Sequence, residues 1–265
     1  MRAFIITAMV MLYSGFSFGE EASSASFVGD WKVIHVRTDS FTSIKVGTYP
    51  DDPRYVGRKI NISDNKISGF LDVDFQCKYT AENAAAESFD NLLLKTTGER
   101  YSDPKVPGAK DFGFKFSGNE NVTPIFVKCN EGTFGPKGYQ VPNWIALLDN
   151  GQLVTNWIDG SFLVLQRMSA NEKVSPGFDC KKSSDPTEIA ICNNSDLSSW
   201  DNSVKTAYEM AISSLSKTDS NSKSSIAKLK SEQLSWIKER NNCNSNISCI
   251  KKSMQDRVDA LEAIF

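Results

Sequence analysis

The last third of the chain carries a helical pattern of apolar positions. Apolar residues recur every three or four positions in three stretches, which places each set on one face of a helix. The sets are Leu197, Trp200, Val204, Ala207, Tyr208, Ala211 and Leu215; then Ile226, Leu229, Trp236 and Ile237; then Ile247, Ile250, Met254, Val258, Leu261 and Phe265. Runs rich in Asn, Asp and Ser separate the stretches and are typical of caps and turns. The pattern predicts a small antiparallel helical bundle whose first helix has Asp196 as its N-cap.

Residues 27–168 instead show the short alternation of apolar and polar positions that is typical of strands. Asn150-Gly151 and Asp159-Gly160 are strong hairpin signals, and Asp64-Asn65 is a weaker one. The predicted strands include 58–63, 66–76, 88–95, 111–116, 122–128, 144–148, 152–158 and 161–167. Eight or nine short strands without a long helix between them predict a closed antiparallel β-barrel or a sandwich. The expected fold class is therefore α+β, with a β-barrel domain followed by a helical domain.

The first residues have the features of an export signal. Met1-Arg2 precedes an apolar run from Ala3 to Tyr13 and a small, polar exit, which is the pattern of a secretory signal peptide over residues 1–19. The run is too short to span a membrane. We therefore expect a periplasmic or secreted protein with a β domain at 26–170, a linker at 171–177 broken by Pro176-Gly177, and a helical domain at 178–265.

Six cysteines in an exported chain predict three disulfides. Two cysteines lie in the β domain and four in the helical domain, so each domain can form its own bridges. The preferred pairing is Cys77–Cys129, Cys180–Cys192 and Cys243–Cys249, although four cysteines permit three connectivities in the helical domain. One histidine and no C-x-x-C motif argue against a metal site.

The helical domain also resembles a known family. Phe178-Asp179-Cys180 is followed by Cys192, by the helix motif Q-x-x-W-x-x-x-R over residues 233–240, and by Cys243, Cys249 and Arg257. Residues 176–265 resemble the LprI-type lysozyme inhibitor domain, a bacterial secreted family. The sequence departs from the usual pattern at Trp200, where Leu is common, and at Met254, where Tyr is common. A second resemblance, on Gly29-Asp30-Trp31 alone, is to the opening of lipocalins and favours the barrel.

Catalytic chemistry finds little support in the sequence. A serine or cysteine nucleophile needs a basic partner, and His35 is the only histidine in the chain. Asp72 and Asp74 point to one face of a strand, where a solvated surface explains them better than an acid–base pair. Residues 20–175 hold 17 basic and 20 acidic side chains, a net charge of −3 that argues against nucleic acid. We expect a protein that is not an enzyme and needs no cofactor.

Two groups of residues are candidates for the site. Long loops at 96–110 and 130–142 carry the expected partner-binding residues, because exposed aromatic side chains on a rigid scaffold favour binding; these residues are Arg100, Tyr101, Phe134 and Tyr139. The alternative is that both are ordinary surface loops. In the helical domain, five signature residues are interpreted as packing and pairing groups: Trp200, Asp201, Gln233, Trp236 and Arg240.

The resemblance implies an exported binding protein that inhibits lysozyme or another peptidoglycan hydrolase by blocking its substrate cleft. Two other hypotheses remain open at this point. The barrel can enclose a small apolar ligand, which would make the protein a lipocalin-like carrier and would require an internal void. The protein can also be an immunity protein against a cell-wall-degrading toxin, which differs only in its partner.

Overall fold

The computed structural model describes residues 26–41, 47–71, 74–136, 142–218 and 221–265. The predicted signal peptide, Asp72 and Tyr139 lie outside these ranges. Among the described residues, no helix is long and apolar enough to cross a membrane, and no cluster of His, Cys, Asp and Glu could hold a metal ion.

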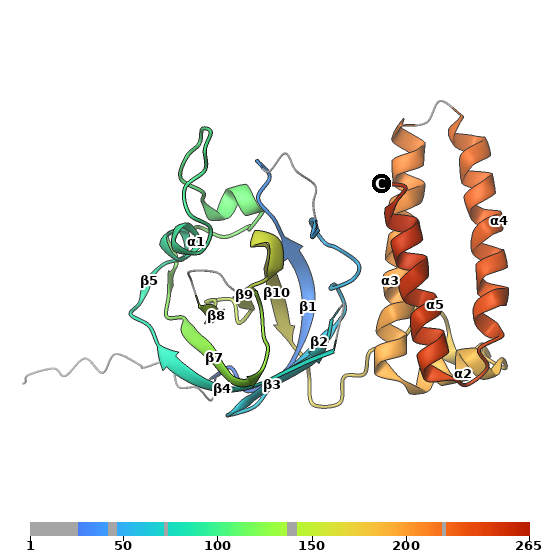
Figure 1. The fold of residues 1–265 in the computed structure, drawn as a ribbon, viewed down its shortest axis with the longest axis horizontal. Helices are drawn as coiled ribbons and strands as arrows, with labels where there is room; N and C mark the ends of the chain where they lie inside the picture. The colour runs from blue at the N-terminus through green and yellow to red at the C-terminus, as the bar shows by residue number, and fades with distance from the viewer. Residues whose placement is uncertain (1–25, 42–46, 72–73, 137–141, 219–220) are drawn as a thin grey trace, which may run out of the picture.

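The N-terminal part is a closed antiparallel β-barrel of eight strands in the order β1-β10-β9-β8-β7-β4-β3-β2 (Figure 1). The barrel prediction is therefore confirmed and the sandwich alternative is wrong. Closure follows from β1, which pairs with both β10 and β2, so that Trp31 lies opposite Arg167 on one side and Ile60 on the other. The strands are β1 Gly29–Arg37, β2 Lys59–Ile62, β3 Lys66–Phe70, β4 Asp74–Asn83, β7 Ile125–Gly132, β8 Asn143–Leu147, β9 Leu153–Asn156 and β10 Phe162–Arg167.

Three predicted strands of the barrel are wrong. The stretch predicted as a strand at 88–95 is helix α1, Phe89–Thr97, which begins where the Ser88 side chain accepts a hydrogen bond from the Asn91 backbone N–H. The stretch at 111–116 starts in a 3-10 helix, η2 Ala109–Phe112. The predicted strand 66–76 is two strands, because β3 ends at Phe70 and β4 begins at Asp74. The short strands β5 Glu87–Ser88 and β6 Asn121–Val122 form a separate pair.

Two apolar clusters hold the barrel together. The first fills the interior with large side chains, among them Trp31, Tyr55, Ile60 and Trp157, none more than 8% exposed. The second lies on the outside of β8, β9 and β10, where α1 and η2 cover Trp144, Phe162 and their neighbours. Side chains that alternate across these strands therefore meet a core on both faces.

The C-terminal part is a helical bundle of α2 Pro186–Asn193, α3 Ser195–Thr218, α4 Ser222–Asn241 and α5 Ile247–Glu262. The three predicted helices are confirmed, and α2 is an additional short one. The predicted N-cap Asp196 is wrong, because α3 begins at Ser195 and the Asn194 side chain accepts hydrogen bonds from the backbone N–H groups of Asp196 and Leu197. The predicted apolar faces meet in one core.

Three disulfides join Cys77 to Cys129, Cys180 to Cys192 and Cys243 to Cys249, the same pairs that the sequence favoured. The first links β4 to β7, and the other two lie in the helical part. Figure 1 shows the bundle beside the barrel, with α3 nearer to the barrel and α4 farther from it. Residues 171–177 connect the two parts without a helix or strand.

Candidate partner-binding site

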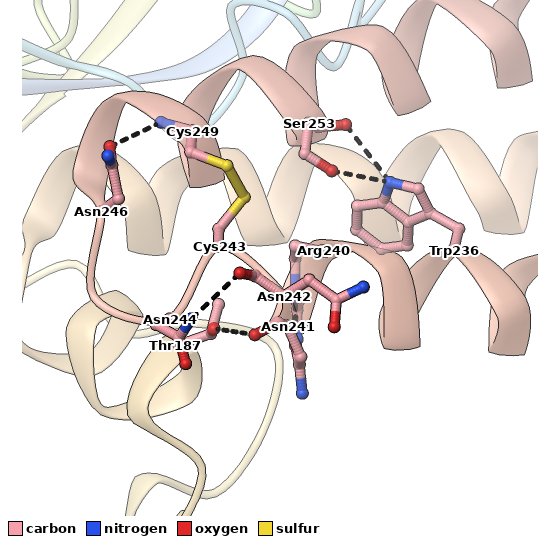
Figure 2. The surroundings of a disulfide bond; sticks show 10 residues. All are labelled: Thr187, Trp236, Arg240, Asn241, Asn242, Cys243, Asn244, Asn246, Cys249 and Ser253. Atoms are coloured by element: carbon pink, nitrogen blue, oxygen red, sulfur yellow. Dashed lines mark hydrogen bonds between the residues drawn. A yellow bond between two sulfur atoms is a disulfide. The ribbon is translucent and has the colours of Figure 1, made fainter.

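The helix motif of the bundle joins α4 to α5. The Trp236 indole N–H donates to the backbone oxygen and the hydroxyl of Ser253, at 3.3 and 3.2 Å (Figure 2). Arg257 Nε donates to Gln233 Oε1 at 2.8 Å. The guanidinium groups of Arg240 and Arg257 lie 5.3 and 6.0 Å from the centre of the Trp236 ring, within reach of a cation–π contact. The motif thus fastens two helices together.

The disulfide Cys243–Cys249 closes the turn between α4 and α5 (Figure 2). Asn246 caps α5 by accepting a hydrogen bond from the Cys249 backbone N–H at 3.0 Å. The Thr187 hydroxyl of α2 donates to the Asn241 backbone oxygen at 3.1 Å. Cap, disulfide and α2 contact together fix the end of α4 relative to the start of α5.

Asp201 of α3 and Arg240 of α4 form a buried ion pair at 3.3 Å. Burial raises the pKa of Asp201, although the Gly177 backbone N–H and Arg240 act in the opposite direction. Burial also lowers the pKa of Arg240, which is only 4% exposed. The pair therefore lies inside the bundle and offers little surface to a partner.

An open groove of about 700 Å³ follows α4 and α5 on the surface of the bundle. Trp236 lines it together with side chains of both charges, including Glu232, Glu239, Lys252 and Asp256. The helix motif thus contributes Trp236 to a surface groove of the bundle.

On the barrel, the loop between α1 and η2 projects beyond α1 (Figure 1). Tyr101 is fully exposed on this loop and Val106 is 57% exposed. Arg100 points into the loop's base instead. It donates to both oxygens of Asp39, at 2.6 and 2.9 Å, to Asp111 Oδ2 and to the Pro104 backbone oxygen. Arg100 therefore shapes the loop, and Tyr101 is the side chain it presents.

Phe134 does not belong to an exposed surface, and its selection as a contact residue is wrong. It is 3% exposed and packs against Phe75 and Trp157 at one end of the barrel interior. The chain turns inward after β7 at Gly132, whose φ is 78° and where a Cβ would lie 1.9 Å from the Gln76 backbone oxygen. Glycine there permits the turn that carries Phe134 into the core.

The contact between barrel and bundle was not foreseen from the sequence. Arg58, which is fully buried beside β2, lies with its guanidinium carbon 3.6 Å from the centre of the Trp200 ring and donates to the Ser203 hydroxyl at 2.8 Å. Tyr49 donates to Glu262 at 2.8 Å at the other end of the bundle. Trp200 is one of the two positions at which the sequence departs from the usual family pattern, but that departure alone did not indicate Arg58 as its partner.

Two polar residues considered for catalysis in the sequence, His35 and Asp74, each pair with an oppositely charged or polar neighbour. His35 Nδ1 lies 3.0 Å from Asp51 Oδ1 on the side of the barrel. Asp74 is paired with Lys251 of α5 at 3.0 Å. The Asp74 side chain is 62% exposed, as expected for a solvated face, and it also forms part of the contact between the two regions.

Fold and site together define a class: a filled antiparallel barrel followed by a disulfide-bonded helical bundle whose motif residues are used for packing. The family model described as Lysozyme inhibitor LprI matches residues 180–261. Residues 180–261 are therefore an LprI domain, and the resemblance seen in the sequence is confirmed. The match leaves out the barrel, for which the comparisons give no lipocalin-like support. No curated protein matches the chain, and no solved structure matches it.

Proposed function

We propose that this protein is exported and inhibits lysozyme or another peptidoglycan hydrolase without catalysing a reaction. The observation that carries the proposal is the LprI match over the bundle. The three disulfides support an extracytoplasmic location, because disulfides persist in oxidising compartments. The immunity-protein alternative involves the same chemistry and differs only in the hydrolase that is bound.

The carrier hypothesis is less well supported. A carrier of a small apolar ligand needs an internal void. Large side chains such as Trp31, Tyr55 and Trp157 occupy the interior here and contact one another or their neighbours. A filled interior supports an inhibitor rather than a carrier.

The proposed mechanism is occlusion of the hydrolase cleft by the loop that carries Tyr101. A blocking loop must hold its shape, and Arg100 supplies this through its four side-chain hydrogen bonds. An exposed aromatic on a fixed loop is a common binding hot spot. The net charge of −3 on residues 20–175 also suits a basic partner, whereas residues 176–265 hold 12 basic and 12 acidic side chains.

The test is an inhibition assay with the full chain. Cell-wall hydrolysis by a panel of lysozymes and bacterial peptidoglycan hydrolases is followed by turbidity, with and without the protein. At least one enzyme should be inhibited at stoichiometric concentration, and binding should be measurable by calorimetry. Failure to inhibit or bind any member of a broad panel would overturn the proposal.

Two substitutions decide which region makes the contact. Tyr101→Ala should weaken binding by about 1–2 kcal/mol, the scale of an aromatic hot spot, without lowering the melting temperature. Ser235→Trp fills the groove between α4 and α5 and serves as the matched variant on the bundle. If Ser235→Trp abolishes inhibition and Tyr101→Ala does not, the bundle is the inhibitory surface and the loop assignment is wrong.

A further inference from the structure

A second groove lies where the outer face of β2, β3 and β4 meets the first turn of α3. Its volume is about 660 Å³, within the range of small-molecule sites. A neighbouring cavity of about 650 Å³ shares Phe70, Asp74, Ser195 and Asp196 with it and extends to Ile247 and Lys251 of α5. The two cavities therefore form one continuous groove between barrel and bundle.

Several charges of this groove pair with one another. Asp30 pairs with Lys59 at 2.8 Å. Lys251 Nζ lies 3.0 Å from both Asp74 and Asp196. Burial alone would lower the pKa of Lys251, but its hydrogen bonds with these carboxylates outweigh burial and raise it. Lys251 is thus a fixed cation. Lys66 and Lys252 also line the groove, but the acidic and basic side chains nearly balance and give no strong preference for a highly charged ligand.

The remaining lining combines neutral polar groups with exposed apolar ones. Asn61, Ser68 and Gln76 supply amide and hydroxyl groups from adjacent strands. The Phe70 ring is 49% exposed at the point shared by the two cavities, and Ile247 is 50% exposed at the far end. Such a mixture suits a ligand with hydroxyl groups around its edge and apolar faces.

Asp196 adds a specific acceptor. Its Oδ2 atom pairs with Lys251, whereas its buried Oδ1 atom has no hydrogen-bond partner among the described residues. A buried acceptor of this kind favours a ligand that brings an N–H or O–H donor. An acetamido group offers an N–H donor, a carbonyl acceptor and a methyl group that an apolar neighbour such as Ile247 can contact.

We propose that this groove binds a short oligosaccharide with acetamido groups, held by Phe70 against one sugar face and by the amide side chains at its edge. Direct binding of an N-acetylated glycan would be a second function, separate from the proposed inhibition of a hydrolase. The inference rests on the groove alone and does not require that a hydrolase is bound.

The experiment titrates the full chain with N-acetylchitotetraose by calorimetry, with no hydrolase present. Cellotetraose is the matched ligand, because it has the same linkage and lacks the acetamido groups. Phe70→Ala should weaken binding about tenfold, the equivalent of about 1.4 kcal/mol. Phe41→Ala removes a phenylalanine of similar exposure (51%) outside the groove and should leave the affinity for the sugar unchanged.

Ser68→Trp is the second variant, because it fills the groove without removing a core side chain. It should abolish sugar binding while the melting temperature stays within a few degrees of the parent. Absence of binding at millimolar sugar, equal affinity for cellotetraose, or unchanged affinity in both groove variants would each overturn the proposal. Sugar binding without inhibition of any hydrolase would instead refute only the proposed function.

Discussion

The barrel and the bundle reach stability in different ways. Each strand of the barrel is paired on both sides, and apolar clusters lie inside the sheet and on part of its outer face. The bundle has one core, and two of the three disulfides lie in it at sequence separations of only 12 and 6 residues. A small domain buries a smaller share of its surface, so it depends more on cross-links.

The bundle also depends on the barrel. Arg58 from the barrel is fully buried against Trp200, a residue that belongs to the bundle's core. The connecting segment is held as well, because the Gly177 backbone N–H donates to Asp201 at 2.9 Å and Asn202 donates to the Ser175 backbone oxygen at 2.7 Å. We therefore expect the barrel to be stable by itself and the bundle to need its contact with the barrel.

Removal of single disulfides gives the largest expected effects. Chain entropy predicts that the free energy of unfolding falls by about 4 kcal/mol when Cys77 and Cys129 are both replaced by Ala. The expected losses are about 3 kcal/mol for Cys180–Cys192 and about 2 kcal/mol for Cys243–Cys249, which span 12 and 6 residues. Chemical denaturation measures the total loss. Hydrogen exchange by mass spectrometry shows where it falls, and the bundle should lose protection first when either of its own bridges is removed.

If loss of a disulfide in the bundle left amide protection in α3 and α5 unchanged, the bundle would not depend on its cross-links. The parent protein also needs a check, since no thiol should react with an alkylating reagent before reduction.

The bundle was easier to predict than the barrel because its signal is local. Its apolar faces recur at helical spacing within single stretches, and the helices follow them. Strand pairing in the barrel is not local, and α1 was mistaken for a strand although Phe89, Leu92 and Leu93 have helical spacing and are buried. The preceding Ser88, an N-cap residue, was the signal that could have corrected it.

The site was predictable only in part. An exposed Tyr101 follows from a long loop, but the inward position of Phe134 depends on the turn at Gly132, and the role of Arg100 depends on Asp39, which is distant in sequence. The contact of Arg58 with Trp200 joins residues 142 positions apart. No local pattern encodes such a pair, so only the three-dimensional fold shows it.

Breaking the buried ion pair between Asp201 and Arg240 should give the next largest loss of stability. Arg240→Ala leaves the Asp201 carboxylate buried without its partner and should lower the free energy of unfolding by about 3 kcal/mol. Adding Asp201→Asn to Arg240→Ala removes the unpaired carboxylate charge as well, so the double variant should lose less stability than Arg240→Ala alone. Denaturation followed by circular dichroism at 222 nm measures both variants, and an equal or larger loss in the double variant would show that the charge of Asp201 is not the cause.

The contact between the barrel and the bundle is expected to contribute somewhat less to the free energy of unfolding than the buried ion pair. Arg58→Ala removes a desolvated cation–π contact and a hydrogen bond to Ser203, and should cost about 2 kcal/mol. Trp200→Leu should cost a similar amount, and the double variant should cost less than the sum of the two. Additive losses in this double-mutant cycle would mean that the two side chains do not stabilise one another.

Cleavage between 171 and 177 tests the same contact directly. A protease site is inserted there, and the cut protein is passed over a gel-filtration column. The two fragments should elute together in the parent and separate in Arg58→Ala. Separation of the parent fragments would show that the contact does not hold the two regions together.

The smallest expected effect is the pH dependence of stability that arises from Glu262, an α5 residue that contacts Tyr49 and Arg54 of the barrel domain. Burial raises the pKa of Glu262 above its usual value of 4.5, although hydrogen bonding to Tyr49 and the nearby Arg54 oppose this rise. The folded protein therefore holds this proton more tightly than the unfolded chain. The stability that protonation supplies is fully present below pH 4.5 and is lost as the pH rises through the folded-state pKa.

Glu262→Gln is permanently neutral and should make this part of the pH dependence disappear. The gain in the free energy of unfolding of Glu262→Gln over the parent should be largest at pH 7. This gain should shrink as the pH falls toward 4.5, because the parent carboxyl then becomes neutral as well. Denaturant titrations of both proteins across this range measure the difference. Glu239→Gln, at an exposed position of α4, controls for the loss of one negative charge. If Glu262→Gln is instead most destabilising at neutral pH, the ion pair with Arg54 outweighs burial and the barrel holds the bundle by charge.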